Sequence, residues 1–366
     1  MSIEFTVKRR LRGRARWLAV MVALGLLAAA CGDDDATSTG DGSEQASGTD
    51  AEPNGTLRLG YFPNVTHAPA INGVQEGIFE HALGDGVDLQ LQTFNAGGEA
   101  IEALIGGSID ATFIGPNPAL NGYSQSDDLL RIVAGTTSGG ASLVVRDGID
   151  SPEDLEGTTL ATPALGNTQD VALRAWLSEE GYETDQSGGG DVSITPQENP
   201  DTLTAFQDGS IDGAWLPEPW ATRLVQEGDG HVLVDEADLW PEGQFVTTQL
   251  IVAKSYLDDH PENVRALISG LLDAIDAAND DPAKAQAVTN DGVEADTTNR
   301  LPDETIAAAW KNLTFTPDPI ASSLEKSKDD AVEAGLLDDV DLGGIYDLSI
   351  LNDLLQERGE PEVDGL

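Results

Sequence analysis

One short stretch of the sequence has the composition of an anion site. In "PALGNTQDVALRAW", small and amide residues at Gly166 and Asn167 come directly before a helical pattern that starts near Thr168. The first-turn N–H groups of a helix have no partner inside the helix, and the helix dipole places about half a positive charge there. The N–H groups of Asn167, Thr168 and Gln169 are therefore candidate anion ligands. Alternatively, Asn167 caps the helix, with Asp170 in a capping-box role.

Signatures of catalysis are missing. The sequence contains no G-x-S-x-G elbow, H-E-x-x-H pair, P-loop or EF-hand spacing, and His67, His81, His231 and His260 are scattered. Pairs of carboxylates carry little information in a chain with 65 acidic side chains. We therefore predict a binding protein rather than an enzyme, with neither a cofactor nor a metal.

Two further loops carry side chains suited to ligand contact, and each has an alternative. His67 in "YFPNVTHAP" either touches a ligand or bonds the local backbone. Glu218 in "LPEPW" either contacts a ligand, through the amine of a zwitterion or the ring nitrogens of a pyrimidine, or accepts backbone N–H groups and holds its turn. Trp220 is expected to form an apolar wall of a cleft, whereas Trp215, between Ala214 and Leu216, is expected in the core.

The elements that would position these loops form a repeat. Strand patterns at 56–62, 87–94 and 109–115 alternate with helical patterns, and a similar series restarts at residue 159. "GSID" occurs at 107–110 and again at 209–212, 102 residues later, before the third strand of each series. We read it as one supersecondary unit used twice, in which Asp110 and Asp212 shape a turn.

This order predicts an α/β fold with two lobes, mostly parallel sheets flanked by helices, and two interlobe crossings near 139–145 and 243–252. Lobe 1 would comprise 56–142 and 248–366, and lobe 2 would comprise 143–247. In the helical tail, an apolar stripe runs along one face of the segment from Pro261. Arg174 is expected to form a surface ion pair.

The N-terminus has the pattern of an export signal. Six basic residues between Lys8 and Arg16 precede an apolar run from Trp17 to Ala30, which is too short to span a bilayer as a stable helix. The run ends in "LLAAAC", typical of a lipoprotein signal that is cleaved before an acylated Cys31. Ordinary cleavage, leaving a free thiol, is the alternative. Residues 31–55 contain no large apolar side chain, and this composition predicts an acidic, flexible tether.

Charge excludes one class of partner. The chain has 19 basic and 65 acidic side chains, a formal net charge of −46. Nucleic acid is therefore not expected as a partner. The global field would also repel an anionic ligand, so that local donors would have to overcome it.

The loops, taken in order, resemble the solute-binding proteins of ABC importers for aliphatic sulfonates, taurine and nitrate. The similarity is carried by "GYFPNVTHAPA", "GSID" before "IGPNPA", "SGGASLVVR", "LATPALGNTQD" and "DGAWLPEPWA", and spans Leu57 to Leu257. It implies a type II periplasmic-binding-protein fold that closes on a solute by a hinge. The cleft contributors that it implies are Asn64, His67, Pro116, Asn117, Ser138, Gly139, Gly140, Gly166, Asn167, Thr168, Gln169, Glu218 and Trp220.

The resemblance also implies partners and a location. The expected protein is a monomer, lipid-anchored through Cys31 on the extracytoplasmic face of the cell membrane, which delivers a small solute to an ABC permease. The expected solute is an aliphatic sulfonate or taurine. The alternatives are nitrate, a pyrimidine-type nutrient, a pyrimidine-precursor synthase-like enzyme on the same fold, or a sensory module.

Overall fold

The structure is a computed structural model that describes residues 53–126 and 129–366. The predicted signal peptide (1–30), Cys31 and most of the predicted tether (to residue 52) lie outside the described residues. The body begins slightly before the predicted boundary, because the backbone of Asn54 exchanges hydrogen bonds with the side chain of Asn263. Within the described residues, no helix is both long and apolar enough to cross a bilayer.

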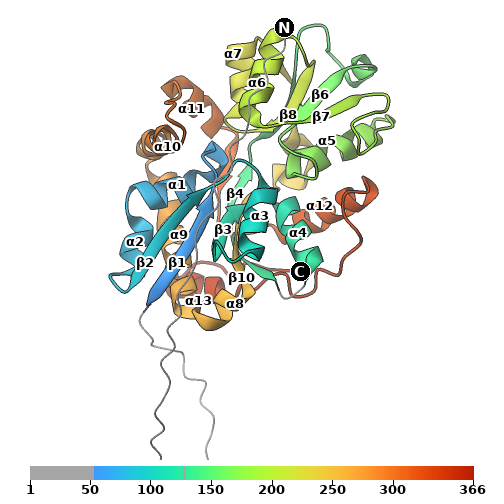
Figure 1. The fold of residues 1–366 in the computed structure, drawn as a ribbon. Coiled ribbons are helices and arrows are strands. Elements are labelled where there is room, and N and C mark those ends of the chain that lie inside the picture. The colour runs from blue at the N-terminus through green and yellow to red at the C-terminus, as the bar shows by residue number, and fades with distance from the viewer. Residues whose placement is uncertain (1–52, 127–128) are drawn as a thin grey trace, which may run out of the picture. The chain divides into compact units, whose positions relative to one another are not determined.

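The first sheet has the strand order β11-β4-β10-β3-β1-β2. β1 pairs in parallel with β2 and β3, whereas β10 is antiparallel to β3 and β4, and β11 is antiparallel to β4. We call the residues built around this sheet lobe 1 (Figure 1). Its strands are β1 (Gly55–Tyr61), β2 (Val87–Thr93), β3 (Ala111–Ile114), β4 (Leu130–Gly139), β10 (Val246–Ala253) and β11 (Leu313–Phe315).

The second sheet, around which lobe 2 is built, repeats this arrangement in the order β7-β6-β8-β5-β9. β6 pairs in parallel with β7 and β8, and β5 is antiparallel to β8 and β9. Its strands are β5 (Ala141–Val145), β6 (Thr159–Thr162), β7 (Ser193–Pro196), β8 (Gly213–Pro217) and β9 (His231–Asp235).

Each sheet is mixed rather than mostly parallel, for a topological reason. The βαβ crossovers expected from the sequence make β1, β2 and β3 parallel in the first sheet and β6, β7 and β8 parallel in the second. The strand next to each parallel group, β10 or β5, arrives from the other sheet and is antiparallel to both of its neighbours. The chain passes between the sheets at Gly140 and again between β9 and β10. The predicted extent of each lobe stays a prediction, since the described residues belong to one compact unit.

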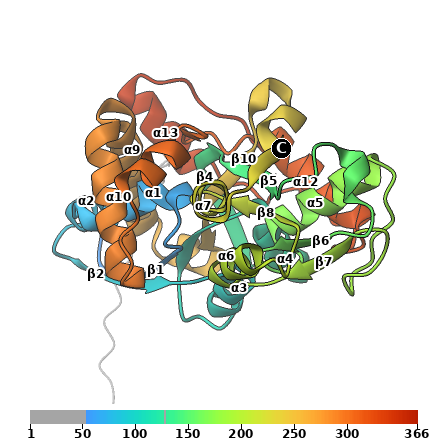
Figure 2. The ribbon, with the colours of Figure 1, turned by 90° about the horizontal axis from the view of Figure 1, so that it is seen from above.

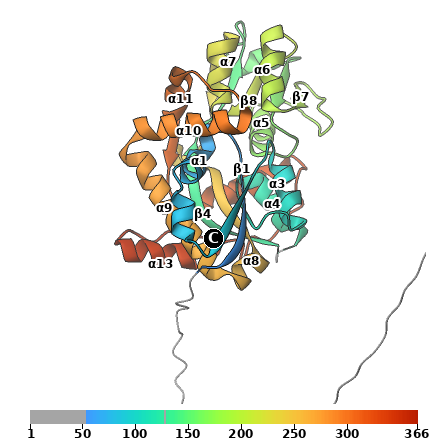
Figure 3. The same cartoon turned by 60° about the vertical axis from the view of Figure 1, so that its left-hand side comes forward.

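Helices cover both faces of the lobe 1 sheet. α1 (Ala68–Gln75), α2 (Ile78–Leu83) and α9 (Pro261–Asp280) share one hydrophobic core, and α3 (Gly97–Ile105), α4 (Pro116–Gln125) and α12 (Ala321–Glu333) share the other. Figures 2 and 3 show these layers from two further sides. The predicted apolar stripe of α9 is confirmed, because Val264, Leu267, Ile268, Leu271, Leu272 and Ile275 are all buried in the first core.

The remaining helices complete lobe 1 and flank the second sheet. Lobe 1 also contains α8 (Lys254–Asp259), α10 (Pro282–Thr297), α11 (Asp303–Trp310) and α13 (Ser349–Arg358), together with the 3₁₀ helix η1 (Val65–His67). In lobe 2, α5 (Thr168–Glu179) packs on one face of the sheet, and α6 (Asn199–Asp208) and α7 (Trp220–Gly228) pack on the other. The short helices η2 (Pro152–Leu155), η3 (Glu236–Leu239) and η4 (Pro241–Gly243) lie in its loops.

The doubled "GSID" ties the third strand of each sheet to the first. The Asp110 carboxylate accepts the backbone N–H of Arg58 at 2.8 Å, and the Asp212 carboxylate accepts that of Thr159 at 2.8 Å. Each carboxylate also has an arginine nearby, Arg58 in lobe 1 and Arg146 in lobe 2. The repeated aspartate is therefore a cross-strand connection at the amino end of the sheet, away from the loops that could hold a ligand.

Candidate functional site

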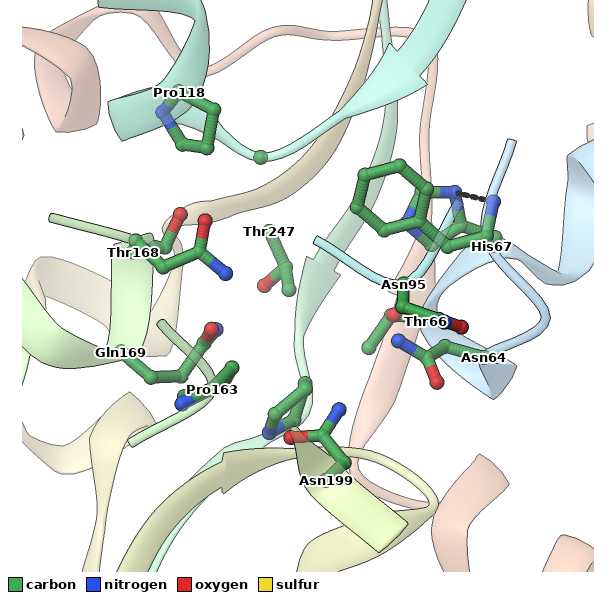
Figure 4. Close-up of a pocket in the computed structure, with 14 residues that line it drawn as sticks. Asn64, Thr66, His67, Asn95, Pro118, Pro163, Thr168, Gln169, Asn199 and Thr247 are labelled. Carbon is green, nitrogen blue, oxygen red and sulfur yellow. Dashed lines mark hydrogen bonds between the residues drawn. The ribbon is translucent and has the colours of Figure 1, made fainter. Parts of the chain in front are cut away.

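The carboxyl ends of the parallel strands in the two sheets face one another across a small polar pocket. Its volume is about 40 Å³, which is room for roughly three water molecules. Figure 4 shows Asn64, Thr66, His67 and Asn95 from lobe 1 opposite Pro163, Thr168 and Gln169 from lobe 2. Thr247 lies between the two groups, Asn199 closes another side, and Phe62, Gly115, Pro118, Asn167 and Pro217 complete the wall. We call this space the inner pocket.

The start of α5 presents unused donors to the inner pocket. Among the described residues, the backbone N–H groups of Thr168 and Gln169 have no acceptor, while the Asn167 N–H donates to the Ala164 carbonyl. The Asn167 side chain makes no capping bond, and Asp170 does not reach the Asn167 N–H. The proposed capping box is therefore absent, and two first-turn N–H groups stay free beside the pocket.

Other helices begin at the same place. η1 starts after Asn64, α4 starts after Gly115, and α6 starts at Asn199. These three residues line the inner pocket. This convergence follows from the topology, because each helix leaves the carboxyl end of a strand. Since helix N-termini carry partial positive charge, the pocket is suited to an anion although no charged side chain lines it.

His67 is a neutral member of the pocket. Its side chain is 3% exposed, and burial lowers the pKa of its imidazole to about 3. The ring stacks on Phe62 at a centroid distance of 4.7 Å, and Nδ1 faces the backbone N–H of Phe62 at 3.4 Å. When Nδ1 accepts this bond, the proton lies on Nε2, which is then a donor. The local backbone bond is thus present, and a ligand contact through Nε2 stays a prediction.

A larger space, the outer chamber, adjoins the inner pocket. It measures about 490 Å³ and shares Asn64, Asn95 and Asn199 with the inner pocket. Trp220 lines it, as predicted for a cleft wall, and its indole N–H donates to the Asn64 amide oxygen across the two lobes at 2.9 Å. The guanidinium of Arg223 lies over the Trp220 ring at 4.5 Å. Apolar side chains make up much of the remaining wall, namely Phe94, Leu203, Val293 and Leu301 with several prolines.

Glu218 does not reach the inner pocket. Its carboxylate accepts the Thr222 hydroxyl at 2.9 Å, the Thr222 N–H at 3.1 Å and the Asn312 amide at 2.6 Å. Burial raises the pKa of this carboxyl above its ordinary value. Of the two interpretations, the structure therefore shows the turn-holding one, and it adds a bond from lobe 2 to the segment before β11.

Several other predicted contributors also lie outside the inner pocket. Pro116 is the first residue of α4, so that Gly115 and Pro118 face the pocket in its place. The Asn117 side chain donates to the Ser327 carbonyl, and the Ser138 hydroxyl accepts the Phe245 N–H. Gly139 and Gly140 lie at the crossing between β4 and β5, and Gly166 lies in the turn before α5. Of the predicted residues, the inner pocket contains Asn64, His67, Asn167, Thr168 and Gln169.

Sequence reasoning missed Thr66, Asn95, Asn199 and Thr247. Asn95 follows β2 and Asn199 follows β7, so the rule that ligands lie beyond the carboxyl ends of parallel strands would have found both. Thr66 is adjacent to His67 in the same loop. Thr247 lies on the antiparallel strand β10, and no local pattern marks it.

The architecture and the site define the class of protein. Two α/β lobes joined by two crossings, with a polar pocket between them, form the periplasmic-binding-protein fold. Two solved structures share this fold. The alkanesulfonate-binding protein SsuA from Xanthomonas axonopodis pv. citri bound to MOPS has a TM-score of 0.66 and 19% identity, over 79% of this chain and 96% of that chain. The nitrate-binding protein NrtA from Synechocystis PCC 6803 has a TM-score of 0.69 and 16% identity, over 82% and 88%.

The chain belongs to the NMT1-like family, which it matches over residues 50–290. The taurine-binding periplasmic protein of Escherichia coli (strain K12) is 30% identical over 190 residues, which cover 52% of this chain and 57% of that protein. The bicarbonate-binding protein CmpA of Synechococcus elongatus is 25% identical over 243 residues, which cover 60% and 53%. The aligned region thus spans little more than half of either relative. The predicted resemblance is confirmed, and the proteins named here are binding proteins rather than enzymes.

Proposed function

We propose that this protein is an extracytoplasmic solute-binding lipoprotein of an ABC importer, which captures a small sulfonate-type anion or zwitterion by hinge closure. The observation that carries the proposal is the pair of free N–H groups at Thr168 and Gln169, in a pocket between two lobes with no charged lining side chain. Anchoring through Cys31 is supported by the export-signal pattern. Delivery to a permease is supported by the names of similar proteins, among them a periplasmic taurine-binding protein and a ligand-binding component of an ABC-type import system.

The charge of the lining favours a singly charged anion. Neutral N–H, amide, hydroxyl and imidazole donors can replace the water around one negative charge, as charge-assisted hydrogen bonds are about twice as strong as neutral ones. Within the inner pocket, no cationic side chain would balance the second charge of a doubly charged anion, since Arg223 and Arg300 line the outer chamber instead. A neutral solute would leave the convergent helix N-termini without a matching charge.

The size of the two spaces favours an organic sulfonate over nitrate. The inner pocket has room for a compact head group, and the walls of the adjoining outer chamber combine apolar side chains with the charged side chains of Glu198, Arg223, Glu227 and Arg300. A nitrate ion would occupy the inner pocket alone. A sulfonate with an alkyl body would place its head on the α5 N-terminus and remove apolar surface from water in the outer chamber.

The amine of a zwitterion such as taurine would meet neutral amides in the inner pocket and the carboxylates of Glu198 and Glu227 in the adjoining outer chamber. Glu218, the carboxylate first considered for this role, is bonded to Thr222 and Asn312 outside the inner pocket. Amide oxygens of Asn95 and Asn199 would be available in its place. The proposal therefore includes both simple sulfonates and taurine as solutes.

The proposal is tested by isothermal titration of the purified body, without the signal and tether, with ethanesulfonate, taurine, butanesulfonate, nitrate, bicarbonate and uracil. We expect sulfonates to bind more tightly than nitrate, bicarbonate or uracil. A ligand at a hundredfold excess over its Kd should also raise unfolding stability by about 2.7 kcal/mol. Binding of uracil alone would support the pyrimidine alternative, and no binding of any compound would refute the proposal.

A further inference from the structure

A buried carboxylate lies next to the free donors of α5. Asp170 is fully buried and accepts the Gly166 N–H at 2.9 Å and the Thr162 hydroxyl at 2.8 Å. Gly166 has φ +72°, in the left-handed region that glycine adopts without strain. Since Thr162 ends β6 and Gly166 begins the turn, Asp170 connects the strand, the turn and the helix.

These bonds determine which N–H groups face the inner pocket. The Gly166 N–H is taken by Asp170, and the Asn167 N–H is taken by the Ala164 carbonyl. The next two N–H groups, of Thr168 and Gln169, are the ones left without an acceptor among the described residues. Asp170 thereby holds the turn in the one arrangement that directs two adjacent donors to the ligand.

The same carboxylate creates an electrostatic problem. Asp170 is in the first turn of α5, one residue after Gln169, and burial removes the water that would screen its charge. Like charges in a low-dielectric interior repel strongly, so an unpaired Asp170 would oppose an anion bound to these N–H groups.

Arg174 compensates this charge. Its Nε donates to Asp170 at 3.0 Å, and its Nη1 donates to the Asp185 carbonyl at 2.7 Å. The side chain is 3% exposed, so the surface ion pair expected from the sequence is a buried one. Arg174 lines neither the inner pocket nor the outer chamber.

We propose that Asp170 and Arg174 are positioning residues for anion capture: Asp170 orients the Gly166–Gln169 turn, and Arg174 neutralises Asp170 so that the turn can hold an anion. This inference rests on the proposed function. It assigns a role in ligand affinity to an ion pair that does not touch the ligand. The ion pair would change the affinity through the net charge that Asp170 and Arg174 together place near the site, without contacting the ligand.

The test is a charge cycle measured with ethanesulfonate by isothermal titration. The variants are Arg174→Met, Asp170→Asn and the double variant. Arg174→Met leaves a buried negative charge and should weaken binding about tenfold or more at pH 8. The double variant is again neutral at this position and should recover most of the wild-type affinity, which loss of packing alone would not allow.

The outcomes are distinguishable. A folded Arg174→Met variant with the wild-type Kd, or a double variant as weak as Arg174→Met, overturns the inference and leaves the proposed function intact. If Arg174→Met does not fold, Asp170→Asn decides: its amide preserves the turn and removes a negative charge, so ethanesulfonate should bind at least as tightly as to wild type. Weaker binding by folded Asp170→Asn overturns the inference.

Two controls complete the design. Lys254→Met removes one partner of an exposed i,i+4 ion pair with Asp258 in α8 and should change no Kd. If wild-type protein binds no sulfonate, the proposed function itself fails, and the role of the ion pair in anion capture fails with it.

Discussion

A proline at the first position of α5 would remove one of the two free N–H groups, together with the Thr168 hydroxyl. Thr168 is the first helical residue, where proline has suitable φ and the missing N–H costs no helical bond. The preceding residue, Asn167, has φ −72° and ψ 166°, an extended conformation that a following proline accepts. Thr168→Pro should therefore fold normally and lose one donor to the ligand.

The expected loss follows from the charge of the ligand. A hydrogen bond to a charged group contributes about 1.5–3 kcal/mol, which corresponds to a Kd increase of roughly 10- to 150-fold. Isothermal titration with ethanesulfonate measures it, and thermal unfolding without ligand checks the fold. Because the substitution also removes a hydroxyl, Thr168→Val is the matched control, and the difference between the two variants reports the N–H.

A second control addresses the general effect of a proline at a helix start. Asp303 is the first residue of α11; its N–H also has no acceptor among the described residues, and it does not line the inner pocket. Asp303→Pro should leave the Kd unchanged. If Thr168→Pro binds ethanesulfonate as tightly as Thr168→Val does, the α5 N-terminus is not the anion site, and the central argument is refuted.

Three other expectations can be measured directly. Affinity for straight-chain sulfonates should rise about fourfold per methylene as the alkyl chain enters the outer chamber. Trp220→Ala should reduce this increase per methylene. Equal affinities along the series would contradict the placement of the alkyl chain in the outer chamber. The Kd of wild-type protein should be constant between pH 5 and pH 8, because the low pKa of His67 keeps it neutral there, so a step near pH 6.5 would contradict the assigned state. Burial raises the pKa of Glu236 from 4.5 to about 7; native protein then binds the extra proton, and unfolding free energy should fall by about 3 kcal/mol as pH rises from 4.5 through 7. Glu236→Gln should remove this slope in urea titrations.

Much of the fold could be predicted, because its signals are local. Short strand patterns indicated β1, β2 and β3, the restart at residue 159 indicated β6, and the apolar stripe of α9 indicated a buried helix. The antiparallel strands were harder to predict. β5 and β10 read as ordinary strands, and their direction depends on which sheet the chain comes from.

The candidate site was predicted in part, for a similar reason. Asn167, Thr168 and Gln169 follow a strand and open a helix, so the sequence marks them. The direction of a side chain is not marked: Asn117 and Glu218 occupy the expected loops but bond to Ser327 and Asn312. Thr247 reaches the pocket only through pairing between strands far apart in the chain.

The two crossings between the lobes lie side by side. The Gly139 N–H donates to the Phe245 carbonyl at 3.2 Å, and the Phe245 N–H donates to the Ser138 hydroxyl at 3.2 Å. Lobe 2 is therefore an insertion whose two ends are fastened together where it leaves lobe 1. In the proposed hinge closure, two connections joined in this way would oppose twisting and sideways sliding of the lobes and favour bending about a single axis. Opening and closing would then retrace one path, so that the same donors meet across the inner pocket at each closure.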